Sequence, residues 1–138
     1  MATTSTPGTQ DPLVGDLRRA GLLPLLILHF AACGRCYGSM LTERIGALTS
    51  GAIAVNPNTM YPLLKTLEAK GLLRGEWETP GRHSRRFYEI TPAGHAERER
   101  LLGELAPRLE RIQQSISTIR LEIASVPPPP SPPPPAPA

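Results

Sequence analysis

Amide, hydroxyl and cationic side chains gather in one short stretch near the middle of the sequence, NPNTMYPLLK. At about 100° per residue, its spacing places Asn58, Tyr61 and Lys65 on one face of a helix, with one formal charge among them. Amides and hydroxyls can exchange hydrogen bonds with base edges, whereas Lys and Tyr can contact phosphates. We therefore expect Asn58 and Thr59 to read bases in double-stranded DNA, and Tyr61 and Lys65 to contact its backbone.

A second stretch, TPGRHSRR, concentrates positive charge in a Pro-Gly turn. Arg82 and Arg85 would neutralise phosphates and make binding salt-dependent, with His83 near the tip of the turn. Arg86 has an alternative, because it could pair with Glu76 or Glu78 across a hairpin. The predicted DNA contacts are Asn56, Asn58, Thr59, Tyr61, Lys65, Arg82, His83, Arg85 and Arg86.

Cys33 and Cys36 are separated by two residues, which would suit a redox pair with Arg35 lowering a thiol pKa, or half of a metal site. A thioredoxin-like site needs a βαβ setting, and the three His residues are not at ligand spacing. We interpret the pair as two incidental cysteines at a helix end and predict no metal and no cofactor. Because no carboxylate pair, phosphate loop or nucleophile-base arrangement is present in the sequence, we predict no catalytic residue and no enzyme.

The first stretch must be positioned by an amphipathic helix that ends at Gly71. Asn56 is a cap-type residue, and Pro57 can occupy the first helical position, where its missing N–H costs nothing. Pro62 lies too deep for a helix that starts at Pro57, and would cost up to about 3 kcal/mol there. We therefore expect either a regular helix that begins nearer Thr59 or a distorted first turn.

The other elements follow from apolar periodicity and turn residues. An apolar block near residues 23–33 and the stretch 37–49 predict two further helices, the second crossing behind the DNA-reading one. Residues 72–78 and 85–90 predict a β-hairpin, and Thr91 caps a final helical region with Pro92 at its first position. The predicted fold is mainly α with a small β-hairpin, a winged helix-turn-helix followed by a C-terminal dimerisation helix.

The final helical region has the most regular pattern of the chain. Its apolar residues alternate steps of four and three, a 3.5-residue repeat that favours packing against another helix. Pro107 should kink this region or divide it in two. We predict a homodimer whose contacts include Leu25 and Leu28 of the first apolar helix and Leu105, Leu109, Ile112, Ile116, Ile119 and Ile123 of the last.

Composition separates the ends from the fold. The chain of 138 residues has a net charge of +3, but residues 92–126 carry equal numbers of Arg and Glu, so the positive excess lies before them. The predicted organisation is a flexible arm at 1–15, a DNA-binding domain at 16–91, a dimerisation helix at 92–126 and a disordered proline-rich tail at 127–138. No run reaches the roughly 18 apolar residues that span a bilayer, so we expect a cytoplasmic protein without membrane contact.

The stretch MYPLLKTLEAKGLLRGEWETPGRHSRRFYEITPAGHAE resembles the PadR family of bacterial transcription regulators. The shared features are Tyr-Pro-x-Leu at 61–64, Leu-x-x-x-Gly-Leu at 67–72, Trp77-Glu78, the Gly-Arg and Arg-Arg wing at 81–86, and Tyr-x-x-Thr-x-x-Gly at 88–94. The resemblance covers about residues 17–102 and implies a winged helix-turn-helix dimer that represses a promoter. Drug-sensing members stack ligand on a Trp of the last helix, which is absent here, and an unidentified small-molecule effector is left open.

We therefore predict a sequence-specific regulator, a repressor that binds a palindromic operator as a homodimer. Two alternatives stay open. One is a winged-helix protein-interaction adaptor that uses the apolar seam and the proline tail. The other is a thiol-based redox-sensing regulator that uses Cys33 and Cys36.

Overall fold

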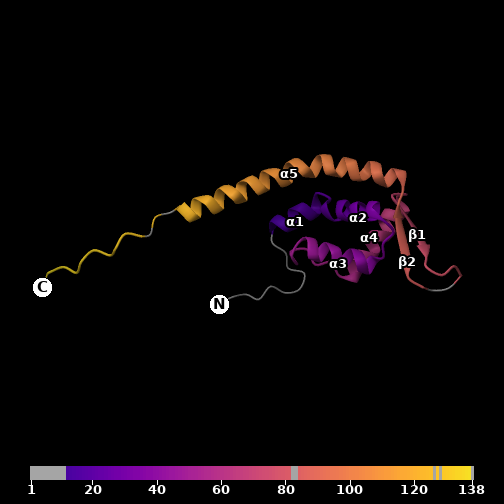
Figure 1. The fold of residues 1–138 in the computed structure, drawn as a ribbon, viewed down its shortest axis with the longest axis horizontal. Coiled ribbons are helices and arrows are strands. Elements are labelled where there is room, and N and C mark those ends of the chain that lie inside the picture. Colours follow the sequence, from indigo (N-terminus) through magenta and orange to yellow (C-terminus); the bar gives the residue numbers. More distant parts are fainter. Residues whose placement is uncertain (1–11, 82–83, 126, 128, 138) are drawn as a thin grey trace. The chain divides into compact units, whose positions relative to one another are not determined.

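The computed structural model describes residues 12–81, 84–125, 127 and 129–137. It divides into two units, one ending at Leu105 and one beginning at Ala106. The elements, drawn in Figure 1, are α1 (Pro12–Arg19), α2 (Leu22–Cys33), α3 (Gly38–Leu48), α4 (Pro57–Ala69), β1 (Leu73–Trp77), β2 (Arg86–Ile90) and α5 (Pro92–Ser125). Helix α1 begins at Pro12 and so extends into the segment 1–15, which we expected to be a flexible arm. Residues 1–11 lie outside the described part.

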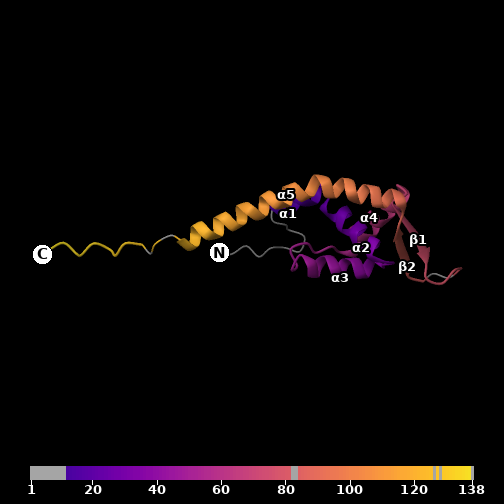
Figure 2. The same ribbon diagram turned by 45° about the horizontal axis from the view of Figure 1, so that its top comes forward.

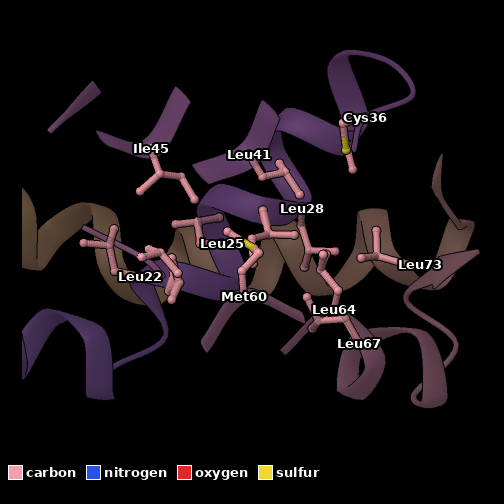
Figure 3. Packing of buried hydrophobic residues seen from close by; sticks show 14 of the residues in the cluster. Leu22, Leu25, Leu28, Cys36, Leu41, Ile45, Met60, Leu64, Leu67 and Leu73 are labelled. Atoms are coloured by element: carbon pink, nitrogen blue, oxygen red, sulfur yellow. The ribbon is translucent and has the colours of Figure 1, made fainter. Parts of the chain in front are cut away.

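The core of the first unit is built around α2, which lies between α3 and the first half of α5 (Figures 1 and 2). Because α2 is apolar nearly all round, it can be covered on several sides at once. Figure 3 shows its leucines packed against Leu41 and Ile45 of α3 and Met60 and Leu64 of α4. All four of these partner residues are completely buried, so the three helices share one core.

Helix α4 begins at Pro57, and the expectation of a start nearer Thr59 is wrong. Asn56 is its N-cap, with its side-chain oxygen accepting a hydrogen bond from the Thr59 N–H at 3.0 Å. The helix continues through Pro62. The carbonyl that Pro62 cannot bond belongs to Asn58, an exposed residue, so water can satisfy it.

The hairpin pairs β1 with β2 in an antiparallel register from Leu73↔Ile90 to Trp77↔Arg86, within one residue of the predicted strand ends. The linker between α2 and α3 joins it, because Cys36 exchanges two backbone hydrogen bonds with Tyr88, of 3.1 and 2.9 Å. This bridge holds the start of α3 beside the hairpin.

The hairpin passes into α5 through a capped turn. The Thr91 hydroxyl accepts a hydrogen bond from the Gly94 N–H at 3.0 Å and donates one to the Gly71 carbonyl at 2.6 Å, which confirms the predicted cap. Gly94 is required there by close contact, since a Cβ at this position would overlap the Leu72 carbonyl oxygen. The start of α5 is therefore fixed to the end of α4 and to the hairpin.

Helix α5 is continuous from Pro92 to Ser125. Of the two outcomes expected at Pro107, a kink or a division, the division does not occur. The carbonyl left without a partner by Pro107 belongs to Gly103, which is exposed and has open space around it. Water can therefore replace the lost hydrogen bond. The described residues after Ser125 form no helix or strand, and Val126 lies outside the described part.

Candidate nucleic-acid interface

The outer face of α4 carries the polar residues that the sequence placed together. Asn58 and Lys65 are exposed and Tyr61 is half exposed, whereas Met60, Leu64 and Leu67 on the opposite side are buried. Helix α4 therefore has the one-sided character that the spacing predicted. Thr59 is partly buried at the edge of the outer face.

Helix α3 and the hairpin enclose this outer face on one side and form a cavity of about 430 Å³. The approach is close because Gly38 has no side chain; a Cβ there would lie 2.9 Å from Cε1 of Tyr61. The first turn of α3 also borders the cavity, and unbonded N–H groups at a helix N-terminus favour anions. The cavity is lined by Tyr37, Gly38, Ser39, Tyr61, Lys65, Trp77, Ser84, Arg85, Arg86 and Tyr88.

Arg85 lies on the cavity wall with its side chain largely exposed. It donates hydrogen bonds to the Glu78 carboxylate from Nη2 at 3.2 Å and from Nε at 3.4 Å, and these raise the pKa of the guanidinium. Its guanidinium carbon is 4.2 Å from the centre of the Tyr37 ring. Arg85 is thus charged, held in place and accessible.

Arg86 is bound differently. Its Nη2 lies 2.6 Å from Oε2 of Glu68 on α4, and both side chains are about 30% exposed. The guanidinium also covers Gly75 and lies 5.2 Å from the centre of the Trp77 ring. The expected partners, Glu76 and Glu78, were wrong because Glu68 reaches Arg86 from the neighbouring helix. Arg86 therefore fastens the hairpin to α4.

The remaining predicted DNA contacts divide into two groups. Asn56 is exposed, but its carbonyl oxygen is used as the cap of α4, which leaves its NH₂ group for a ligand. Arg82 and His83 lie outside the described residues. Apart from Trp77, five residues that line the cavity were not among the predicted contacts, namely Tyr37, Gly38, Ser39, Ser84 and Tyr88. The sequence held a signal for two of them, since Ser84 lies in the basic turn stretch and Tyr88 in the alternating pattern of the second strand.

Trp77 lines the cavity and is 40% exposed. It is the last residue of β1, four positions beyond Leu73, which is buried in the core. Trp77 therefore belongs to the wall of the candidate site.

The predicted dimer contacts also divide. Leu25, Leu28 and Leu105 are buried in the core of the first unit, with at most 6% exposure, so they are already used within the chain. Ile112 is partly buried. Leu109, Ile116, Ile119 and Ile123 are exposed and stay candidates for contact with another molecule.

The two cysteines differ in environment and form no disulfide. Cys36 is buried, its thiol lies 3.8 Å from the Tyr88 carbonyl oxygen, and burial raises its pKa to about 11. Arg35 does not lower that pKa, because it faces Glu89 at 3.2 Å and stacks on Phe87. Thiolate chemistry at Cys36 is therefore disfavoured. Among the described residues, no group of three metal-binding side chains occurs.

A helix with a polar outer face, packed across a second helix and followed by a hairpin with an exposed cation, defines a winged helix-turn-helix protein of the DNA-binding class. Residues 27–100 match the family described as transcriptional regulator PadR-like, and the chain belongs to that family. Within the part of the chain that the structure describes, no helix has the length and apolarity needed to cross a membrane.

Individual proteins that are similar to this chain are also transcriptional regulators. Transcriptional regulator Rv3488 of Mycobacterium tuberculosis is 44% identical over 85 residues, which cover 59% of this chain and 77% of that protein. A PadR family transcriptional regulator from Eggerthella lenta has a TM-score of 0.51 at 30% identity, over 78% of this chain and 88% of that one. A transcriptional regulator from Clostridium thermocellum has a TM-score of 0.62 at 24% identity, over 72% of this chain and 93% of that one, and shows the shared fold.

Proposed function

We propose that this DNA-binding regulator is a repressor that acts as a homodimer on a palindromic operator. Two winged domains related by a two-fold axis would place two copies of α4 in successive major grooves, with half-sites about one helical turn apart. A bound repressor of this kind would exclude transcription from the promoter that contains the operator.

The observation that carries this proposal is the shared cavity between α4 and the hairpin. Asn58 and Thr59 lie in the first turn of the helix whose outer face reaches the cavity through Tyr61 and Lys65, and Arg85 lines the cavity from the hairpin, directly before β2. Because the outer face of α4 has only one cation, most of the attraction to phosphate must come from the wing and from the α3 N-terminus. Base reading and backbone contact would then be divided between two elements.

The proposed dimer would use the exposed seam of α5. Its isoleucines repeat at the 3.5-residue spacing of helices that pack in pairs. Ile116, Ile119 and Ile123 are between 46% and 69% exposed, so complete burial of each would contribute roughly half of the 1.5 to 3 kcal/mol that burial of a fully exposed side chain provides. A second copy offers the same seam in a self-complementary arrangement.

The test begins with selection of bound fragments from genomic DNA, followed by fluorescence anisotropy on the selected operator and on a scrambled duplex. We expect Asn58→Ala to reduce discrimination between the two duplexes, because a base contact is lost. Arg85→Ala should weaken binding to both and lower the slope of log K against log salt by about 0.9. Arg120→Ala, which removes an exposed charge from the second unit, is the matched control and should leave discrimination unchanged.

Two results would contradict the proposal. One is unchanged affinity in both Asn58→Ala and Arg85→Ala. The other is a selection that returns no common sequence. Repression itself is tested by transcription from the selected promoter, which should rise when the protein is removed.

A further inference from the structure

A carboxylate lies where the proposed DNA surface should be most positive. Glu78 follows β1 and faces Arg85 across the hairpin, one step beyond the last pair of the register, Trp77↔Arg86. The Glu78 N–H donates to the Arg85 carbonyl at 2.7 Å, so the two residues are directly opposed and their side chains share one face of the hairpin. A phosphate that approaches Arg85 must therefore also approach Glu78.

Two donors hold this carboxylate. Arg85 reaches Oε1 at 3.2 Å and Oε2 at 3.4 Å, and the Tyr37 hydroxyl donates to Oε1 at 3.2 Å. The Tyr37 ring in turn lies under the Arg85 guanidinium at 4.2 Å. Glu78, Arg85 and Tyr37 thus form a closed triangle in which each member contacts the other two.

The triangle leaves Arg85 one edge for a ligand. Glu78 takes the Nε and Nη2 side of the guanidinium, and in the described part of the chain no hydrogen bond engages Nη1. Arg85 can therefore bind a phosphate through Nη1 while Glu78 fixes its orientation. The adjacent negative charge of Glu78 reduces the energy of that contact for DNA of any sequence.

Most of the positive charge that lines the cavity is paired with carboxylates. Of its three cations, Arg86 is paired with Glu68 and Arg85 with Glu78. Lys65 has no carboxylate within ion-pair distance among the described residues. Arg85 and Arg86 therefore attract phosphate less strongly than unpaired cations would, and the pairing carboxylates set how much these two residues add to binding of any duplex.

We propose that Glu78 is a specificity-determining residue, which orients Arg85 over Tyr37 and lowers affinity for DNA of unrelated sequence. This inference rests on the proposed function and adds to it a role for a residue outside the reading helix. Removing the charge should strengthen binding to any duplex and leave Arg85 less well oriented. Binding to the operator should therefore gain less than binding to a scrambled duplex.

The experiment compares Glu78→Gln with the wild-type protein and with Glu76→Gln. Gln keeps the length and an acceptor oxygen, so the charge is what changes. Glu76 is the matched control because it lies two residues earlier in the hairpin and loses the same charge, but its partners are Arg74 and Arg35 instead of Arg85 and Tyr37. Dissociation constants are measured for the operator and for a scrambled duplex of equal length at three salt concentrations.

For Glu78→Gln we expect affinity for the scrambled duplex to rise about three- to tenfold, with a smaller rise for the operator. Glu76→Gln should stay within about twofold of wild type on both duplexes. Tyr37→Phe, which removes one hydrogen bond from Glu78 and keeps the ring under Arg85, should reduce discrimination to a smaller extent.

The inference is overturned if Glu78→Gln leaves scrambled binding unchanged, if it weakens that binding, or if Glu76→Gln has an equal effect. Failure of the proposed function has a different signature, which is equal affinity of the wild-type protein for operator and scrambled DNA. In that case the gain of Glu78→Gln on scrambled DNA still supports the role of Glu78 in limiting attraction to phosphate, and its absence overturns that role.

Discussion

The two halves of α5 use the same kinds of residue for opposite purposes. Before the unit boundary, Leu101 and Leu105 are at most 5% exposed and complete a core made by α2, α3 and α4. After it, Ile119 and Ile123 are more than half exposed in one uninterrupted helix. The apolar repeat is therefore covered by the chain's own core up to Leu105, and it leaves Ile119 and Ile123 as exposed apolar surface further along the helix.

Polar groups divide in the same way. Two polar groups are already bonded inside the first unit. Arg86 forms an ion pair with Glu68, and the Asn56 side-chain oxygen accepts a hydrogen bond from the Thr59 N–H. Lys65 and Asn58 are exposed on the outer face of α4. Residues of one type thus serve the fold at one position and are left for a ligand at the next, and the difference should appear in separate measurements of stability and binding.

The largest expected effect is on the exposed seam. Replacing both Ile116 and Ile119 by Asp should weaken the proposed dimer on the order of a thousandfold, because charges would be buried without partners. Leu121→Asp is the control, since Leu121 is 72% exposed and lies outside the 3.5-residue repeat. Sedimentation equilibrium gives the result. If Leu121→Asp weakened the dimer as much as the double Asp variant, the exposed isoleucines would not form the dimer contact. If the wild-type protein were monomeric, the proposed dimer itself would be refuted.

The next effect concerns the first half of α5. Gly94→Ala places a Cβ against the Leu72 carbonyl and should lower the free energy of unfolding by about 3 kcal/mol. Gly103→Ala, in the same helix but in open space, should raise it by about 0.5 to 1 kcal/mol. Urea denaturation measures both. If the two substitutions had similar effects, the contact between Gly94 and the Leu72 carbonyl would not be tightly packed.

A buried group of the core should also respond to pH. Because burial raises the pKa of Cys36 to about 11, the folded state keeps a proton that the unfolded chain releases near pH 9. Stability should therefore be full below pH 9 and fall by about 2 kcal/mol as pH rises towards 11. Cys36→Ala should remove this part of the loss, while Cys33→Ser, at an exposed position, should keep it. The measurement is the denaturation midpoint of the wild-type protein and of both variants at pH 8 and at pH 10.5.

Local patterns predicted the hairpin, both helix caps and the polar outer face of α4, because turn residues and periodicity act over a few positions. They failed for Arg86, whose partner Glu68 lies 18 residues away on another helix. They also failed for Leu28 and Leu105, since an apolar repeat does not say whether its own chain or a partner covers it. Pro62 and Pro107 did not end their helices because the carbonyls they leave unbonded belong to exposed residues.

The smallest predicted effect separates two neighbouring asparagines. Asn56→Ala should lower the free energy of unfolding by about 1 kcal/mol, because the Thr59 N–H loses its acceptor, and Asn56→Ser should restore most of it. Asn58→Ala should change stability by no more than about 0.5 kcal/mol. Its effect should appear in operator discrimination, measured by anisotropy on the same preparations. If Asn58→Ala destabilised the fold as much as Asn56→Ala, Asn58 would be part of the scaffold, and base reading would have to move to Thr59 and the wing.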